Sequence, residues 1–125
     1  MKTKILVVDD SGLARRIIRK ILEELDYDVE DVPDGAQALE RYALDRHSAV
    51  ILDMVMHGMY GLEVLVKLRE LNPSLPVVVV SADIQKSTRE QVKDAGAAAM
   101  INKPVNKEEL AEVLNTVLKG GTTWN

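Results

Sequence analysis

The sequence contains no cysteine and no phenylalanine, and aromatic residues make up only 3% of its 125 positions. Without cysteine, a disulfide framework and thiolate metal sites are excluded, and the composition fits a cytoplasmic protein. No apolar run approaches membrane-spanning length, and the first residues lack the pattern of a secretory signal. The formal net charge of −4 argues against bulk nucleic-acid binding. We therefore expect a cytoplasmic protein without membrane insertion or direct nucleic-acid contact.

The residues that are present favour one folded domain. Hydrophobic residues make up 46% and charged residues 29% of the chain, which is typical of globular proteins. No repeat, low-complexity stretch or linker divides it, so we expect a single domain over residues 1–121. Gly120 and Gly121 follow the last apolar helix pattern, and residues 122–125 are expected to form a flexible tail.

Apolar strand patterns alternate with helical patterns along the whole chain. The expected strands are Lys4–Val8, Asp28–Val32, Ala49–Asp53, Pro76–Ser81 and Ala97–Ile101. The expected helices begin after Ser11, after Asp34, near Gly61, at Asp83 and after Asn106; the third ends at Leu71 and the fourth at Ala95. This alternation predicts an α/β protein with helices on both faces of the sheet, and the weakly apolar second strand suits an edge.

Polar side chains stand where the predicted strands end. Asp9 and Asp10 follow the first strand, Asp53 closes the third, Ser81 closes the fourth and Lys103 follows the fifth. Because ligands of α/β sheets bind outside the carboxyl ends of the strands, we expect these side chains to meet. Carboxylates held that close repel one another unless a cation joins them. The pattern therefore indicates a site for a hard metal ion beside a reactive aspartate.

These residues, in this order, resemble a known family. The matching segments are Val7-Val8-Asp9-Asp10-Ser11, Asp53 followed by Met54-Val55-Met56, Val80-Ser81-Ala82, and Lys103-Pro104. Together they resemble the receiver domain of two-component response regulators, and the resemblance runs from the first strand to the last helix. It implies a flavodoxin-like, doubly wound, five-stranded parallel sheet of strand order 2-1-3-4-5, similar to the chemotaxis response regulator.

The resemblance also implies a chemistry for the site. Asp53 would be the nucleophile that accepts a phosphoryl group from a histidine kinase or a histidine phosphotransfer protein, which makes the chain a signalling switch rather than an ordinary enzyme. Lys103 would supply positive charge to the phosphoryl oxygens, and the Ser81 hydroxyl would hydrogen-bond one of them. Mg²⁺, with Mn²⁺ as a possible substitute, would bind Asp9, Asp10, Asp53 and the backbone carbonyl of Val55.

The resemblance also carries expectations about output and about one peptide bond. The surface for downstream proteins would comprise the Asp83–Ala95 helix, the Ala97–Ile101 strand and the last helix. Met100 stands where the family usually has an aromatic switch residue, so an aromatic readout through that position is excluded. Because no output domain follows the last helix, we expect a stand-alone receiver that acts by protein contact. The Lys103-Pro104 bond is expected to be cis, as is usual in the family.

Two other functions are compatible with an aspartate nucleophile or a flavodoxin-like fold. A metal-dependent phosphatase with an aspartate nucleophile would need a cap that this chain is too short to contain. A flavin- or nucleotide-binding flavodoxin-like module would need a phosphate-binding loop after the first strand, where Asp9 and Asp10 stand instead.

Arg15, Arg16, Arg19 and Lys20 form a basic patch on the first predicted helix, which we interpret as a solvated face.

Overall fold

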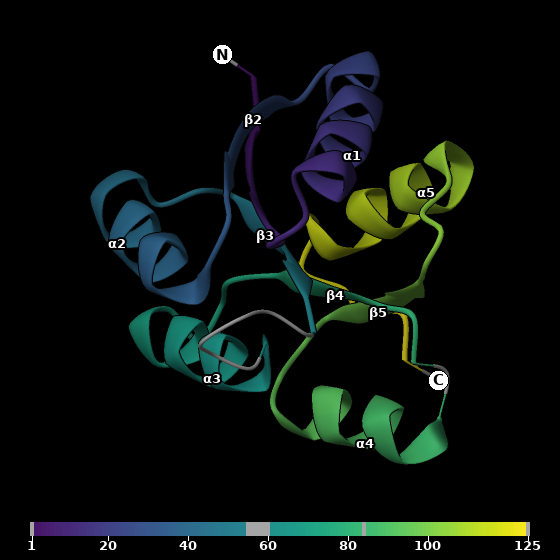
Figure 1. Cartoon of the computed structure of the whole chain (residues 1–125). Helices are drawn as coiled ribbons and strands as arrows, with labels where there is room; N and C mark the ends of the chain where they lie inside the picture. The colour runs from purple at the N-terminus through teal and green to yellow at the C-terminus, as the bar shows by residue number, and fades with distance from the viewer. Residues whose placement is uncertain (1, 55–60, 84, 125) are drawn as a thin grey trace.

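The computed structural model describes residues 2–54, 61–83 and 85–124, and its strands and helices alternate throughout (Figure 1). The strands are β1 (Lys4–Val8), β2 (Asp28–Val32), β3 (Ala49–Asp53), β4 (Val77–Ser81) and β5 (Ala99–Asn102). The helices are α1 (Gly12–Glu24), α2 (Gly35–Asp45), α3 (Gly61–Leu71), α4 (Lys86–Asp94) and α5 (Lys107–Val117). Among the described residues, no helix has the length and apolar character required to cross a lipid bilayer.

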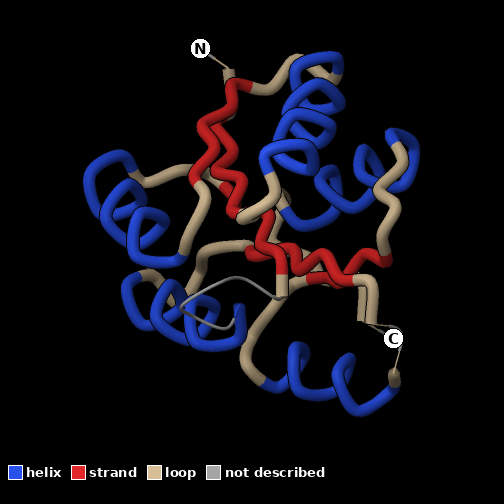
Figure 2. Tube along the Cα trace, viewed as in Figure 1, coloured by secondary structure: helices blue, strands red, loops and turns tan. Residues whose placement is uncertain are grey.

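The strands form one parallel sheet in the order β2-β1-β3-β4-β5, which confirms the expected flavodoxin-like topology. Helices α1 and α5 pack on one face and α2, α3 and α4 on the other, so the sheet is the middle of three layers (Figures 1 and 2). β2 lies at one edge, as its weakly apolar sequence predicts, and β5 lies at the other. All carboxyl ends therefore open at the same edge of the sheet.

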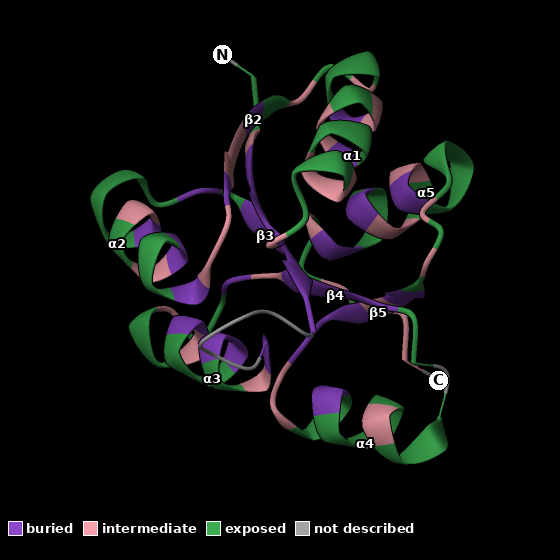
Figure 3. Ribbon diagram, in the orientation of Figure 1, coloured by how far each residue is buried: buried purple, intermediate pink, exposed green. Residues whose placement is uncertain are grey.

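The central strands are buried on both faces (Figure 3). Every residue of β3 and β4 is buried, and only Lys4 at the start of β1 is partly exposed. Because successive side chains of a strand point to opposite faces, each strand supplies both cores at once. Burying this apolar surface is the main stabilising contribution to the fold, and it holds the polar strand ends in place.

Three helices begin at residues whose side chains cap them, as the sequence predicts. Ser11, Asp34 and Asn106 accept hydrogen bonds from the backbone N–H groups of Ala14, Gln37 and Glu109, respectively. Each bond satisfies a donor that has no partner inside the helix. The start of α1 is therefore fixed directly after the acidic pair Asp9-Asp10.

Helix α4 is shorter than predicted, because it begins at Lys86 rather than at Asp83. The carboxylate of Asp83 accepts hydrogen bonds from the Gln85 backbone N–H (2.8 Å) and the Thr88 hydroxyl (2.6 Å), so Asp83 lies before the helix rather than in it. β5 likewise begins at Ala99 instead of Ala97, and β4 begins at Val77 instead of Pro76. The Lys103-Pro104 peptide bond is cis, as predicted.

The segment after α5 returns to the residues that directly precede the edge strand β5. The Thr123 backbone N–H donates to the Ala98 carbonyl (3.0 Å), and the Trp124 indole N–H donates to the Ala97 carbonyl (2.7 Å). The guanidinium of Arg89, on α4, lies 4.9 Å from the centre of the Trp124 ring. Trp124 thus contacts both α4 and the segment that directly precedes β5.

Candidate functional site

The candidate site is assembled from the ends of neighbouring strands. β1 pairs with β3 so that Val8 lies opposite Leu52, which sets Asp9 beside Asp53. The Asp9 backbone N–H also donates to the Val32 carbonyl at the end of β2 (3.2 Å). The register of the sheet therefore positions both acids before any side-chain contact is made.

Three carboxylates meet at this edge. Asp9, Asp10 and Asp53 each offer an oxygen atom, and these atoms all lie within 4.8 Å of one another. Asp9 is 1% exposed and Asp53 is 8% exposed, so little water screens the repulsion between them. Hard divalent cations prefer oxygen ligands in such an arrangement, and the donor set fits Mg²⁺. The fourth predicted ligand, the carbonyl of Val55, lies outside the described residues.

Lys103, which directly follows β5, reaches two of these carboxylates. Its Nζ lies 3.2 Å from Oδ2 of Asp9 and 3.3 Å from Oδ1 of Asp53. Its backbone N–H donates to the Ser81 carbonyl (2.9 Å), so the end of β4 holds the lysine in place. A single ammonium group therefore bridges two nearly buried acids.

Burial and charge shift the ionisation of both partners. Burial is the largest cause that raises the pKa of Asp53 above its ordinary value; Asp9 raises it further and Lys103 opposes both. Burial alone would lower the pKa of Lys103, but the carboxylates of Asp53 and Asp9 raise it above its ordinary value. The site therefore keeps a charged lysine beside an aspartate whose negative charge costs free energy in the absence of a second cation.

Ser81 lies at the end of β4 and is 3% exposed. Its Oγ accepts a hydrogen bond from the Asp83 backbone N–H (3.0 Å), a bond that leaves the hydroxyl proton available for another acceptor. A cavity of about 430 Å³ opens beside it, between Met54, Leu62 and Thr88. Ser81 thus contacts Lys103 through its backbone carbonyl and the turn before α4 through its hydroxyl.

Gly61, where the sequence predicts the start of the third helix, also determines how closely α3 approaches the site. Its N–H donates to the Met54 carbonyl (2.9 Å). A Cβ atom at this position would lie 2.5 Å from the Asp53 carbonyl oxygen and 2.7 Å from the Met54 Cα, closer than real atoms approach. Only glycine therefore allows α3 to begin this close to the end of β3.

A second acidic cluster, which the sequence analysis missed, lies between β2 and the end of α2. Glu30, Asp45 and His47 offer potential metal ligands within 4.8 Å of one another. However, Arg41 pairs with Glu30 and Lys4 pairs with Asp45, and Nε2 of His47 lies 2.7 Å from Glu30. Because Arg41 and Lys4 already neutralise the two carboxylates, we interpret this cluster as a structural ion-pair network.

Comparison with known proteins identifies the same family that the sequence motifs resemble. Residues 5–115 match the family model of the response regulator receiver domain. The chain is 39% identical over 122 residues to the response regulator MprA of Mycolicibacterium vanbaalenii, covering 98% of this chain and 53% of the relative. It is 40% identical over 119 residues to MprA of Mycobacterium ulcerans, covering 95% of this chain and 51% of the relative. The chain therefore spans about half the length of these relatives.

Solved structures agree with the sequence relatives. A CheY-like receiver domain protein from Methanospirillum hungatei matches with a TM-score of 0.89 at 28% identity, covering 95% of each chain. The chemotaxis protein CheY4 of Vibrio cholerae also matches with a TM-score of 0.89 at 28% identity, covering 94% of this chain and 99% of that one. The family match extends over most of the sequence and includes every described residue of the acidic site. This chain belongs to the response regulator receiver domain family of two-component signalling.

Proposed function

We propose that this receiver domain accepts a phosphoryl group on Asp53 from the phosphohistidine of a histidine kinase or a histidine phosphotransfer protein. The observation that carries the proposal is the cluster of three carboxylates within 4.8 Å, with the ammonium of Lys103 at 3.3 Å from Asp53. A mere strand-end turn would not need two nearly buried acids at this separation. Family membership favours this function over the phosphatase and flavodoxin-like alternatives.

In the proposed reaction, an Asp53 oxygen forms the new bond to phosphorus while the bond from phosphorus to the histidine nitrogen breaks. The electron pair of the broken bond stays on the imidazole, which is released with a proton from solvent. Lys103 neutralises charge on the phosphoryl oxygens. Asp9, Asp10, Asp53 and the Val55 carbonyl would hold Mg²⁺, or Mn²⁺ in its place, and the bound cation would supply positive charge between the carboxylate and the phosphoryl group.

The signal would pass from Ser81 to α4. The Ser81 hydroxyl can donate to a phosphoryl oxygen, and its Oγ already holds the Asp83 N–H at the turn before α4. Only Val92 of α4 is buried, so a small change in this turn can shift the helix between two populated positions. Phosphorylation then changes a conformational equilibrium instead of building a new fold.

The output surface would comprise α4, β5 and α5, where a downstream protein binds. Met100 of β5 is half-buried and packs against the core beneath α4, so an apolar side chain rather than an aromatic ring lies behind this surface. A flexible methionine can follow a moving helix by changing rotamer. The proposed output therefore depends on repacking of apolar groups around α4.

The test is phosphorylation by a small-molecule donor. The wild type is incubated with acetyl phosphate and Mg²⁺, and the intact mass and the modified peptide are measured by mass spectrometry. We expect one added phosphoryl group on Asp53, lost in Asp53→Asn and when Mg²⁺ is chelated. Asp94→Asn, which removes an exposed carboxylate on α4, is the matched control and should be labelled like the wild type.

Beryllofluoride, which forms a phosphoryl-like group on aspartate, gives an independent measurement. Amide chemical shifts of the wild type with beryllofluoride and Mg²⁺ should change at Ser81 and along α4. Labelling of Asp53→Asn to the same extent as the wild type, or an α4 that does not respond to a modified Asp53, would contradict the corresponding part of the proposal.

A further inference from the structure

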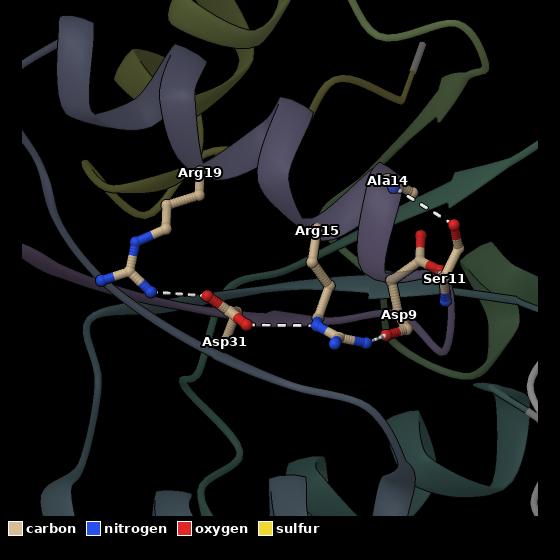
Figure 4. A network of polar contacts seen from close by, with 6 residues as sticks. All are labelled: Asp9, Ser11, Ala14, Arg15, Arg19 and Asp31. Carbon is tan, nitrogen blue, oxygen red and sulfur yellow. Dashed lines mark hydrogen bonds and ion pairs between the residues drawn. The ribbon is translucent and has the colours of Figure 1, made fainter.

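The basic residues of α1 divide into two groups. Arg16 and Lys20 are exposed, in agreement with the predicted solvated face, whereas Arg15 and Arg19 point toward the ends of β1 and β2 (Figure 4). The interpretation of all four as a solvated face is therefore wrong for Arg15 and Arg19. Arg15 makes contacts that lead directly to the acidic site.

Arg15 connects a side chain on β2 to the backbone of the acidic pair. Its Nη1 donates to the backbone carbonyl of Asp9 (2.7 Å), and its Nε donates to Oδ1 of Asp31 (3.1 Å). The second oxygen of Asp31 accepts from Nη1 of Arg19 (2.5 Å). Both oxygens of the Asp31 carboxylate are thus engaged, and the planar guanidinium of Arg15 is held on two sides.

The Asp9 carbonyl belongs to the peptide group that joins Asp9 to Asp10. A peptide group is planar, so the bond from Arg15 sets the direction in which the chain enters Asp10. The other polar atoms of Asp9 are also engaged: its N–H donates to Val32, its Oδ1 accepts from the Ser11 N–H (2.9 Å), and its Oδ2 accepts from Lys103. Arg15 supplies the remaining backbone contact of this residue.

The positive charge of Arg15 should weaken the binding of a cation at the acidic site. A guanidinium in contact with the Asp9 backbone repels a dication bound by the Asp9 and Asp10 side chains. Loss of the charge alone should therefore strengthen the binding of Mg²⁺. Loss of the hydrogen bond should weaken it, because Asp10 would no longer be held where the other two carboxylates can share a cation. The charge and the hydrogen bond of Arg15 thus have opposite effects on Mg²⁺ affinity, and an experiment can separate them.

We propose that Arg15, anchored by Asp31, is a positioning residue that orients the Asp9–Asp10 peptide for metal binding. The inference rests on the proposed Mg²⁺ site. Partners that orient metal ligands typically change affinity by about 10- to 100-fold when they are removed. Because Arg15 acts on the backbone rather than on a ligand side chain, we expect a loss near the lower end, about tenfold.

The experiment compares two neighbouring arginines of the same helix. Arg15→Met and Arg16→Met each remove one positive charge, and Mg²⁺ affinity is measured by calorimetry on the full chain without a phosphodonor. We expect binding about tenfold weaker in Arg15→Met, whereas Arg16→Met should bind as tightly as the wild type or slightly more tightly. Amide chemical shifts of Asp9 and Asp10 should move in metal-free Arg15→Met and not in Arg16→Met.

Two further variants keep the proposal open to refutation. Arg15→Lys retains the charge but not the planar fork, and should recover only part of the affinity. Asp31→Asn weakens the anchor, and should reduce affinity even if Arg15→Met fails to fold. Equal or tighter Mg²⁺ binding in Arg15→Met, or in Asp31→Asn if Arg15→Met does not fold, would overturn the positioning role. A wild type that binds no Mg²⁺ would instead overturn the metal site itself, and the positioning role with it.

Discussion

Replacement of Lys103 by methionine tests the electrostatic description of the site most directly. Methionine is close to lysine in shape, so the substitution removes the ammonium group and little packing. In the wild type this ammonium lies 3.2 Å from Asp9 and 3.3 Å from Asp53, whose carboxylates approach within 4.8 Å of each other. The variant leaves these two acids close together without their shared cation.

The expected loss of stability in Lys103→Met can be worked out from these distances. With an effective dielectric constant of about 20, each ammonium–carboxylate contact contributes about 5 kcal/mol of gross attraction, and the two acids repel by about 3 kcal/mol or more. Most of the attraction is cancelled by the free energy needed to remove the lysine from water, and Lys103 keeps 31% of its side chain exposed. We therefore expect Lys103→Met to lower the free energy of unfolding by about 2–3 kcal/mol at neutral pH without Mg²⁺, somewhat below the usual loss for a fully buried pair.

The loss should depend on pH and on Mg²⁺. The pKa of Asp53 is raised in the folded protein, so the folded state holds this proton more tightly than the unfolded chain does. The contribution of Asp53 to stability therefore falls as pH rises from its ordinary pKa through its folded value, and removal of Lys103 raises that folded value further. The difference between variant and wild type should shrink in acid, where Asp53 is protonated, and shrink on addition of Mg²⁺, which replaces the missing charge.

The assay is urea unfolding followed by far-ultraviolet circular dichroism, with and without Mg²⁺, over a range of pH. Lys107→Met is the matched control, since its Nζ lies 3.9 Å from Glu24 on a side chain that is 47% exposed. We expect this control to change the free energy of unfolding by no more than about 0.5 kcal/mol. Unchanged stability of Lys103→Met without metal, or a loss that Mg²⁺ leaves undiminished, would refute the electrostatic reasoning.

The remaining predictions concern packing around the site and in the core. Gly61→Ala places a methyl group 2.5 Å from the Asp53 carbonyl oxygen, so we expect unfolding free energy to fall by about 1–3 kcal/mol and acetyl phosphate labelling to decrease. Gly12→Ala, whose added Cβ has its nearest neighbour at 3.7 Å, is the control and should do neither. Leu22→Ala removes a fully buried side chain of α1 and should cost about 2–5 kcal/mol in urea unfolding while Mg²⁺ affinity stays unchanged. Normal labelling of Gly61→Ala, or a wild-type unfolding midpoint for Leu22→Ala, would contradict these expectations.

The parts of the fold that depend on local pattern were predictable from the sequence. The ends of β1 and β3 coincide with the expected ranges because a run of apolar residues followed by aspartate marks both burial and its limit. The caps Ser11, Asp34 and Asn106 were also predictable from local sequence, because a capping side chain acts within three residues of its own position. The topology came from the family resemblance, because alternation alone does not determine strand order.

The start of α4 was not predictable from periodicity. Asp83 has the character of an N-terminal helix residue, yet its carboxylate bonds both Gln85 and Thr88 and thereby holds a turn before the helix. Such side-chain bonds compete with helical hydrogen bonds, and the outcome depends on the positions of both partners. An aspartate at a helix boundary therefore indicates the boundary only to within a few residues.

Two residues of the site region depend on distances that the sequence does not contain. Gly61 is required because α3 starts against the end of β3, and no local pattern records how closely those two elements approach. Arg15 lies on a polar face that periodicity correctly assigns away from the core, but its partners are Asp9, directly after β1, and Asp31 of β2. Helical spacing separates buried from exposed faces, and it does not separate a solvated arginine from one that contacts a neighbouring strand.

Trp124 is the only tryptophan in the chain, and its indole is wedged between Arg89 of α4 and the Ala97 carbonyl. Tryptophan fluorescence of this chain therefore reports on the region where α4 meets the segment before β5. Three tyrosines elsewhere in the sequence also contribute to the total protein fluorescence. A displacement of α4 would move the Arg89 guanidinium relative to the indole ring. The protein thus carries a native fluorophore at the place where its proposed signal emerges, and stopped-flow fluorescence can follow that event without a label.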